Sequence, residues 1–182
     1  MDDYQVIESR IIFDHPGITI LSDTVDHLGM LHAYLYLVSP VDSVATVGIT
    51  DAQEIILTRQ YRHPIGQVIY DLPAGRLEPG ENPEDGARRE FEEETGYYPR
   101  HIEQIGSYNE FPGTLRAKIT LFFASDLMRT RQNLNEGEEL ETVLMNVEEV
   151  LRMIINGEVI DGSLQLGVLL ALQKGLISVR SR

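Results

Sequence analysis

The sequence predicts an α+β fold, with a β-rich N-terminal part followed by a mixed part of strands and helices. Residues 4–45 are rich in β-branched and aromatic residues, and helical patterns begin only near residue 83. From there strands and helices mix without strict βαβ alternation, so a helix–sheet–helix sandwich is the architecture expected for the longer part. We therefore expect an N-terminal β domain over residues 1–43 and a second domain over residues 44–182.

The N-terminal domain is expected to hold three strands separated by turns that contain glycine or proline. Residues 15–17 and 27–29 mark two of these turns, and residues 39–43 mark the end of the domain. The expected strands are residues 6–13, 18–25 and 31–38.

The second domain is expected to combine six strands with three helices. The expected strands are residues 45–50, 54–61, 69–72, 102–108, 118–124 and 141–147. The expected helices are residues 83–95, 148–156 and 163–176, and Leu164, Val168, Ala171 and Leu172 give the last one an apolar stripe.

The helix over residues 83–95 has a marked start and a marked end. Asn82 is a favourable N-cap residue, and Pro83 occupies the first helical position, where its missing N–H costs nothing. Gly96 is a natural C-terminal stop. On a helical wheel with Ala87 at zero, Phe91 falls at about 40°, so these two residues define the buried side.

Four glutamates in the second half of this helix differ in the direction they face. Glu94 and Glu90 fall at about 340° and 300°, beside the buried stripe, whereas Glu93 lies near Arg89 and Glu92 points towards solvent. Glu90 and Glu94 form a like-charge pair that costs a few tenths of a kcal/mol. They also lie where the helix dipole disfavours anions by roughly 0.3–1 kcal/mol.

Two interpretations of these glutamates remain open from the residues alone. The run is either a solvated acidic face, since glutamate forms helices well, or a site for a divalent cation that offsets the repulsion. Oxygen ligands at positions i and i+4 suit Mg²⁺ or Mn²⁺, which keep several waters and bridge to phosphate.

The segment from Gly75 to Tyr97 resembles the Nudix box. The resemblance rests on Gly75, Glu81 and the run from Arg89 to Tyr97, which reads REFEEETGY. It implies an α/β/α sandwich with a small N-terminal β-sheet domain, and hydrolysis of a diphosphate linked to another moiety with Mg²⁺ or Mn²⁺. It also implies a role for six residues: metal ligation by Glu90, Glu94, Glu93 and the carbonyl of Ala74, orientation of these glutamates by Arg89, and a further carboxylate from Glu81.

Similarity outside the box resembles one subgroup, the ADP-ribose and nucleoside diphosphate sugar pyrophosphatases. The residues that carry it are 59–64 (RQYRHP), 70–75 (YDLPAG), 111–113 (FPG) and the acidic loop 136–139 (EGEE). The subgroup keeps its general base in that loop, which makes Glu138 the first candidate and Glu136 the second, with Glu138 also a candidate metal ligand. The substrate-binding residues implied are Arg59, Arg62, Tyr61, Arg76, Phe111, Pro112, Gly113 and Arg116. The chain departs from the subgroup at Asp71, where glutamate is common, and after Gly113, where Arg116 and Lys118 replace an acidic pair.

The predicted partner is a nucleoside diphosphate sugar, and the subgroup implies a homodimer with an exchanged N-terminal domain. A net charge of −14 with no compensating basic face argues against nucleic-acid binding, and the apolar runs are too short to span a bilayer. The absence of cysteine and of a secretory pattern favours the cytoplasm. Rival functions are a Nudix hydrolase for GDP-mannose, NADH or dinucleoside polyphosphates, a non-catalytic nucleotide-binding regulator, and an acidic domain that binds cations for stability.

Overall fold

The computed structural model describes residues 3–179 and divides them into two compact units. The first unit runs to Asp42 and includes Tyr108–Lys118, and the second comprises Ser43–Ser107 and the chain from Ile119 onwards. The return of residues 108–118 to the first unit was not anticipated by the sequence, because two residues of strand give no periodic pattern. Each unit is described by itself below.

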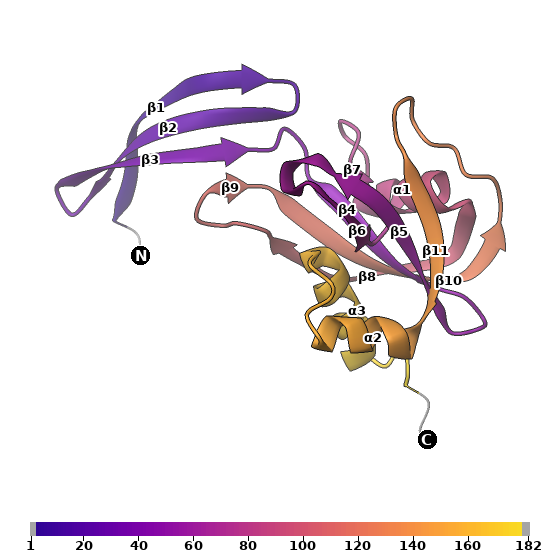
Figure 1. The fold of residues 1–182 in the computed structure, drawn as a ribbon. Helices are drawn as coiled ribbons and strands as arrows, with labels where there is room; N and C mark the ends of the chain where they lie inside the picture. Colours follow the sequence, from indigo (N-terminus) through magenta and orange to yellow (C-terminus); the bar gives the residue numbers. More distant parts are fainter. Residues whose placement is uncertain (1–2, 180–182) are drawn as a thin grey trace. The chain divides into compact units, whose positions relative to one another are not determined.

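The first unit is an antiparallel sheet with one short added strand (Figure 1). Its order is β1-β2-β3-β9, and β9 runs parallel to β3. Its strands are β1 (Tyr4–His15), β2 (Ile18–His27), β3 (Met30–Val38) and β9 (Leu115–Arg116). Many large apolar side chains of β1 and β3 are exposed, among them Ile11, Phe13, Leu31 and Leu35.

The second unit is built on a mixed sheet with the order β11-β5-β4-β10-β8, to which β6 adds beside β5 and β7 beside β4. The strands β4 and β10 pair in parallel, with Ser43 opposite Ile119. The strands are β4 (Ser43–Ile49), β5 (Glu54–Arg62), β6 (Gln67–Asp71), β7 (Ala74–Arg76), β8 (Tyr97–Asn109), β10 (Lys118–Arg129) and β11 (Leu140–Asn146). A short 3₁₀ turn, η1 (His63–Ile65), joins β5 to β6.

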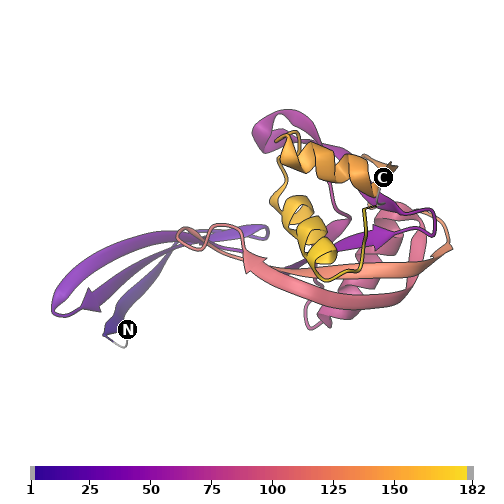
Figure 2. The ribbon, with the colours of Figure 1, turned by 90° about the horizontal axis from the view of Figure 1, so that it is seen from below.

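Helices cover both faces of this sheet (Figure 2). The helices are α1 (Pro83–Thr95), α2 (Val147–Ile155) and α3 (Gly162–Gln173). Neighbouring residues of β4 show the two layers, since Gly48 lies against the ring of Phe91 in α1 and the side chain of Val47 lies against Gly167 in α3. Because β4 is covered on both sides, its residues form an almost continuous buried run. The predicted sandwich is confirmed.

The helix α1 begins and ends where its capping residues predict. The side chain of Asn82 accepts a hydrogen bond from the N–H of Glu84, and Gly96 adopts the left-handed conformation with φ of 72°. Ala87 and Phe91 are fully buried against the sheet, as the helical wheel predicts. This packing fixes the rotation of the helix and therefore the direction of its glutamates.

Several strands are longer than the sequence predicts. β8 begins at Tyr97 rather than residue 102 and passes through Pro99, which an edge strand tolerates because its missing N–H can face away from the sheet. β10 runs on to Arg129, five residues past the expected end. The strand β7 is only three residues long and was not predicted. Within residues 3–179, no helix has the length and apolar character needed to cross a bilayer.

Candidate active site

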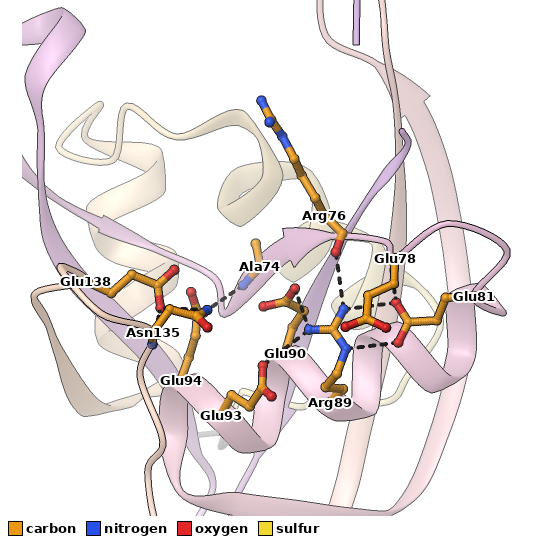
Figure 3. A network of polar contacts seen from close by, with 10 residues as sticks. All are labelled: Ala74, Arg76, Glu78, Glu81, Arg89, Glu90, Glu93, Glu94, Asn135 and Glu138. Atoms are coloured by element: carbon orange, nitrogen blue, oxygen red, sulfur yellow. Dashed lines mark hydrogen bonds and ion pairs between the residues drawn. The ribbon is translucent and has the colours of Figure 1, made fainter. Parts of the chain in front are cut away.

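Arg89 is the centre of a network of carboxylates on α1 and in the loop before it (Figure 3). Its Nε and Nη2 atoms each donate to one carboxylate oxygen of Glu81, both at 2.9 Å. Its Nη1 atom donates to Glu90 at 2.8 Å and to Glu93 at 3.2 Å. Hydrogen bonding to Glu81 is the main reason that the pKa of Arg89 is raised, and the same pair lowers the pKa of Glu81. One guanidinium thus fixes three acidic side chains.

The carboxylate of Glu90 lies directly over Gly75 of β7. A Cβ atom at Gly75 would lie 2.0 Å from Cδ of Glu90 and 2.2 Å and 2.3 Å from its oxygens. Only glycine leaves room for that carboxylate, which explains the residue type at the start of the box. Burial raises the pKa of Glu90, although Arg89 opposes the shift.

Glu94 is the most deeply buried acid of the group, with 7% of its surface exposed. Its Oε2 atom accepts a hydrogen bond of 2.9 Å from the backbone N–H of Ala74. Burial raises the pKa of Glu94 to about 8, and the charges of Glu90 and Glu138 act in the same direction. Such perturbed carboxyl groups are typical of functional sites.

A cavity of about 420 Å³ opens beside Glu94. The residues that line it come from β5, β7, α1, the loop before β11 and the first residue of β11: Gln60, Tyr61, Arg62, Ala74, Glu94, Gly137, Glu138, Glu139 and Leu140. Its volume is in the range of small-ligand sites. Oε2 of Glu138 accepts hydrogen bonds from the N–H and the side-chain amide of Asn135, at 2.9 Å and 3.2 Å. The neighbouring Glu136 is exposed and does not line the cavity.

Arg62 enters this cavity while bound to a buried acid. Its Nε donates to Oδ2 of Asp71 at 2.8 Å, its Nη2 donates to the same oxygen, and the amide of Gln60 donates there at 3.1 Å. Asp71 is 2% exposed, and its Oδ1 has no partner among the described residues. Burial raises the pKa of Asp71, against the effect of Arg62. Arg62 is therefore oriented before any ligand arrives.

The other predicted substrate-binding residues of the second unit are exposed, as Arg62 is. Arg59 forms an ion pair of 3.3 Å with Glu141 on the neighbouring strand β11. Tyr61 lines the cavity and packs edge-on against His63, with ring centroids 6.1 Å apart. The side chain of Arg76 points away from the network, and its carbonyl accepts a hydrogen bond from Arg89 (Figure 3).

Four predicted substrate-binding residues belong to the first unit, so their placement is described there alone. Phe111 is 70% exposed, and Pro112, Gly113 and Arg116 line a cavity of about 480 Å³ within that unit. The guanidinium of Arg116 lies 4.9 Å from the ring centre of Tyr36 and donates to its hydroxyl at 2.6 Å.

Glu92 differs from its predicted position. It is half-buried rather than directed fully into solvent, and it lines a second cavity with Arg88, Glu93 and Tyr98. The reason is tertiary: β8 and the segment after β10 cover this side of the helix, which a helical wheel cannot foresee.

The donor set suits a hard divalent cation. Within residues 3–179, no three His, Asp or Glu side chains converge closely enough to form a complete metal cage. Mg²⁺ does not need one, because it usually binds through one or two carboxylates and completes its shell with water and phosphate. Glu90 and Glu94 fit this requirement, since both are half-buried or buried carboxylates whose charges repel one another.

The sequence did not single out the residues that support these groups. Gln132 and Thr142 donate to the backbone carbonyl of Glu94, and Gln60 assists Asp71. A neutral amide or hydroxyl in a loop or strand carries no pattern that distinguishes such a role from a surface position. Among these supporting residues, only Asp71 stands out in the sequence, as a departure from the subgroup.

Comparison with known proteins places this geometry in a family. The NUDIX domain family model matches residues 39–162. An ADP-ribose pyrophosphatase of Bacillus subtilis is 36% identical over 121 residues, which is 65% of each chain. A methanol dehydrogenase activator of Bacillus methanolicus is 34% identical over 137 residues, 74% of each chain. The crystal structure of an ADP compounds hydrolase superimposes with a TM-score of 0.87 and covers 97% of both chains at 19% identity, so it supports the fold.

Proposed function

This chain belongs to the Nudix family, and on that premise we propose that it hydrolyses the diphosphate bond of ADP-ribose and related nucleoside diphosphate sugars. The products would be a nucleoside monophosphate and a sugar phosphate. The observation that carries the proposal is the cavity in which Glu94, Arg62 and Glu138 meet beside the Arg89 network. The relatives named ADP-ribose pyrophosphatase support the choice of substrate class.

The cofactor proposed is Mg²⁺ or Mn²⁺, held by Glu90 and Glu94 with help from Glu93, Glu138 and the carbonyl of Ala74. A divalent cation at such a site supplies charge neutralisation for the phosphoryl oxygens and lowers the pKa of a bound water. The protein's contribution is to keep the ligands in place: Arg89 holds Glu90 and Glu93, and the N–H of Ala74 holds Glu94.

Glu138 is the proposed proton acceptor. Asn135 holds its Oε2 atom, so Oε1 is assigned to take the proton of the attacking water. Glu136 is the second candidate, and its position outside the cavity makes it the weaker one. Arg62, oriented by Asp71, is proposed to contact the diphosphate through its Nη1 atom, since guanidinium groups suit phosphate oxygens.

The proposal is tested by turnover of a panel of nucleotides with Mg²⁺ and with Mn²⁺, with identification of the products. ADP-ribose should give AMP and ribose 5-phosphate. Preferential turnover of GDP-mannose, NADH or a dinucleoside polyphosphate would agree with a Nudix hydrolase but contradict the proposed substrate. Binding of nucleotide with no turnover of any member would favour a non-catalytic regulator.

A matched pair of variants tests the site within the same assay. Glu94→Gln should abolish most turnover and leave the fold intact, whereas Glu92→Gln makes the same charge change two residues away and should leave turnover within about twofold. Near-normal turnover of Glu94→Gln at saturating Mg²⁺ would remove Glu94 from the metal site.

We further propose that the first unit pairs with a second copy of the chain. The support is the exposure of apolar side chains along β1 and β3, where Ile11 and Leu35 are each 65% exposed. Exposed apolar surface of this kind is costly unless it is covered. Leu35→Glu should shift a dimer towards monomer in analytical ultracentrifugation, and a wild-type chain that sediments as a monomer at micromolar concentration would contradict the proposal.

A further inference from the structure

The segment between β10 and β11, residues 130–139, is attached to the C-terminal end of α1. The last four carbonyls of a helix lack partners within it. The N–H of Gly96 donates to the carbonyl of Glu92, and the N–H of Asn133 donates to the carbonyl of Glu93, both at 2.8 Å. The side-chain amide of Gln132 donates to the carbonyl of Glu94 at 2.7 Å. Two consecutive residues of the segment therefore bind two consecutive carbonyls of the helix.

A third donor comes from the neighbouring strand. The hydroxyl of Thr142 in β11 donates to the same Glu94 carbonyl at 3.1 Å, and the Gln132 amide lies 3.4 Å from that hydroxyl. The segment is thus fixed at its start by Thr130, whose N–H donates to the carbonyl of Gly96 at 2.8 Å, by Gln132 and by Asn133, and at its end by β11. Between these points lies Glu138, which has no helix or strand to support it.

Both the side chain and the backbone carbonyl of Glu94 accept hydrogen bonds in this arrangement. Its carboxylate accepts from Ala74, and its carbonyl accepts from Gln132. The residue that faces the cavity from the helix is therefore also the attachment point of the loop that brings Glu138 to the same cavity.

A neutral donor is suited to this position. Helix C-termini favour cations, yet the last turn of α1 contains no basic residue. A lysine or arginine there would pair with the glutamates that are proposed to hold the metal ion. The amide of Gln132 satisfies the carbonyl without competing for those carboxylates.

We propose that Gln132 is a positioning residue that sets the place of Glu138 relative to Glu94. The proposal rests on the proposed function, in which Glu138 accepts the proton of the attacking water. Gln132 touches neither substrate nor metal in this role; it acts through the loop.

The first test is Gln132→Ala, compared with Asn133→Ala as the control. Asn133 holds the helix through its backbone, so truncating its side chain keeps that bond. Gln132→Ala should lower kcat about 10-fold or more, with KM and the Mg²⁺ dissociation constant from calorimetry within about twofold. Asn133→Ala should leave all three unchanged. An unchanged kcat in Gln132→Ala would overturn the proposal, as would equal loss in kcat, Mg²⁺ affinity and thermal stability.

The second test asks whether Gln132 acts through Glu138. In a Glu138→Gln background, Gln132→Ala should cause no further loss of kcat, because residues that act as a unit are not additive. Additive losses would indicate a purely structural role and would overturn the proposal. So would full kcat in Glu138→Gln, since Gln132 would then have nothing to position.

Hydrogen–deuterium exchange separates this proposal from the proposed function. Amides of residues 134–139 should exchange faster in Gln132→Ala than in Asn133→Ala or the wild type. Unchanged exchange would overturn the positioning role even in an active enzyme. Absence of turnover in the wild type, with faster exchange in Gln132→Ala, would overturn the proposed function. It would still support the attachment of the loop 134–139 to α1 through Gln132.

Discussion

Replacing Gly75 by alanine tests the site at its tightest contact. The added Cβ would lie 2.0 Å from Cδ of Glu90, and ordinary contact begins at 3.4 Å, so the carboxylate must move by 1.4 Å (3.4 minus 2.0). Because the obstructing atoms are the end of a flexible side chain, the backbone need not move. The fold should therefore be retained, while the metal site should lose the carboxylate of Glu90.

The expected loss follows from the size of that movement. Mg²⁺ requires near-ideal octahedral geometry at about 2.0–2.1 Å, so a ligand displaced by more than 1 Å is lost. A misplacement of about 1 Å costs roughly 100-fold in rate. Gly75→Ala should therefore lower kcat/KM for ADP-ribose by about 100-fold or more, weaken Mg²⁺ binding in calorimetry, and leave the circular dichroism spectrum unchanged.

Shortening the displaced side chain provides the control. Glu90→Asp withdraws the carboxylate from Gly75, so Gly75→Ala should cost little further activity in the Glu90→Asp background. The steric explanation would be refuted by a Gly75→Ala enzyme with wild-type Mg²⁺ affinity. It would also be refuted by equal losses from Gly75→Ala in both backgrounds.

Three further outcomes are expected. Without divalent cations, the free energy of unfolding should fall as pH rises from about 4.5 to 8, because burial raises the pKa of Glu94 to about 8 and the folded state binds the proton more tightly than the unfolded one. Thermal melts in EDTA should show this slope, and Glu94→Gln should reduce it, with the remainder due to Glu90 and Asp71, whose pKa values burial also raises. Asp71→Asn should lower kcat/KM about 10-fold, because both hydrogen bonds from Arg62 lose their charged acceptor, and steady-state kinetics that match the wild type would argue against that orienting role. Gly48→Ala should lower the free energy of unfolding in urea by about 1–3 kcal/mol, because its Cβ would lie 2.3 Å from the buried ring of Phe91. An unchanged midpoint of urea unfolding would show that the ring can move aside.

The parts of the fold that the sequence predicts are those with local causes. Asn82, Pro83 and Gly96 act on their own helix, so the bounds of α1 are predicted to the residue. The rotation of α1 is predicted as well, because Ala87 and Phe91 define one apolar stripe. The strand β7 is not predicted, since three residues held by pairing with β4 have no pattern of their own.

The site divides in the same way. The acids of the box can be identified from their spacing. The spacing does not show which residues of other strands and loops bind these acids. The contact between Asp71 and Arg62 and that between Gln132 and Glu94 both depend on how distant segments pack. The resemblance ranks Glu138 before Glu136, but that Glu138 lines the cavity and Glu136 does not depends on the path of an irregular loop.

The parallel pairing of β4 with β10 has a consequence for how the protein is made. Ser43 pairs with Ile119, so the centre of the sheet closes only after more than 70 intervening residues have been synthesised. Contacts of such long sequence separation slow folding, because the chain must lose loop entropy before they form. During synthesis on the ribosome, α1 would emerge well before β10, the strand that pairs alongside β4 beneath it. Until β10 arrives, the buried cluster that joins Ala87 of α1 to Val44, Phe122 and Ala124 stays incomplete.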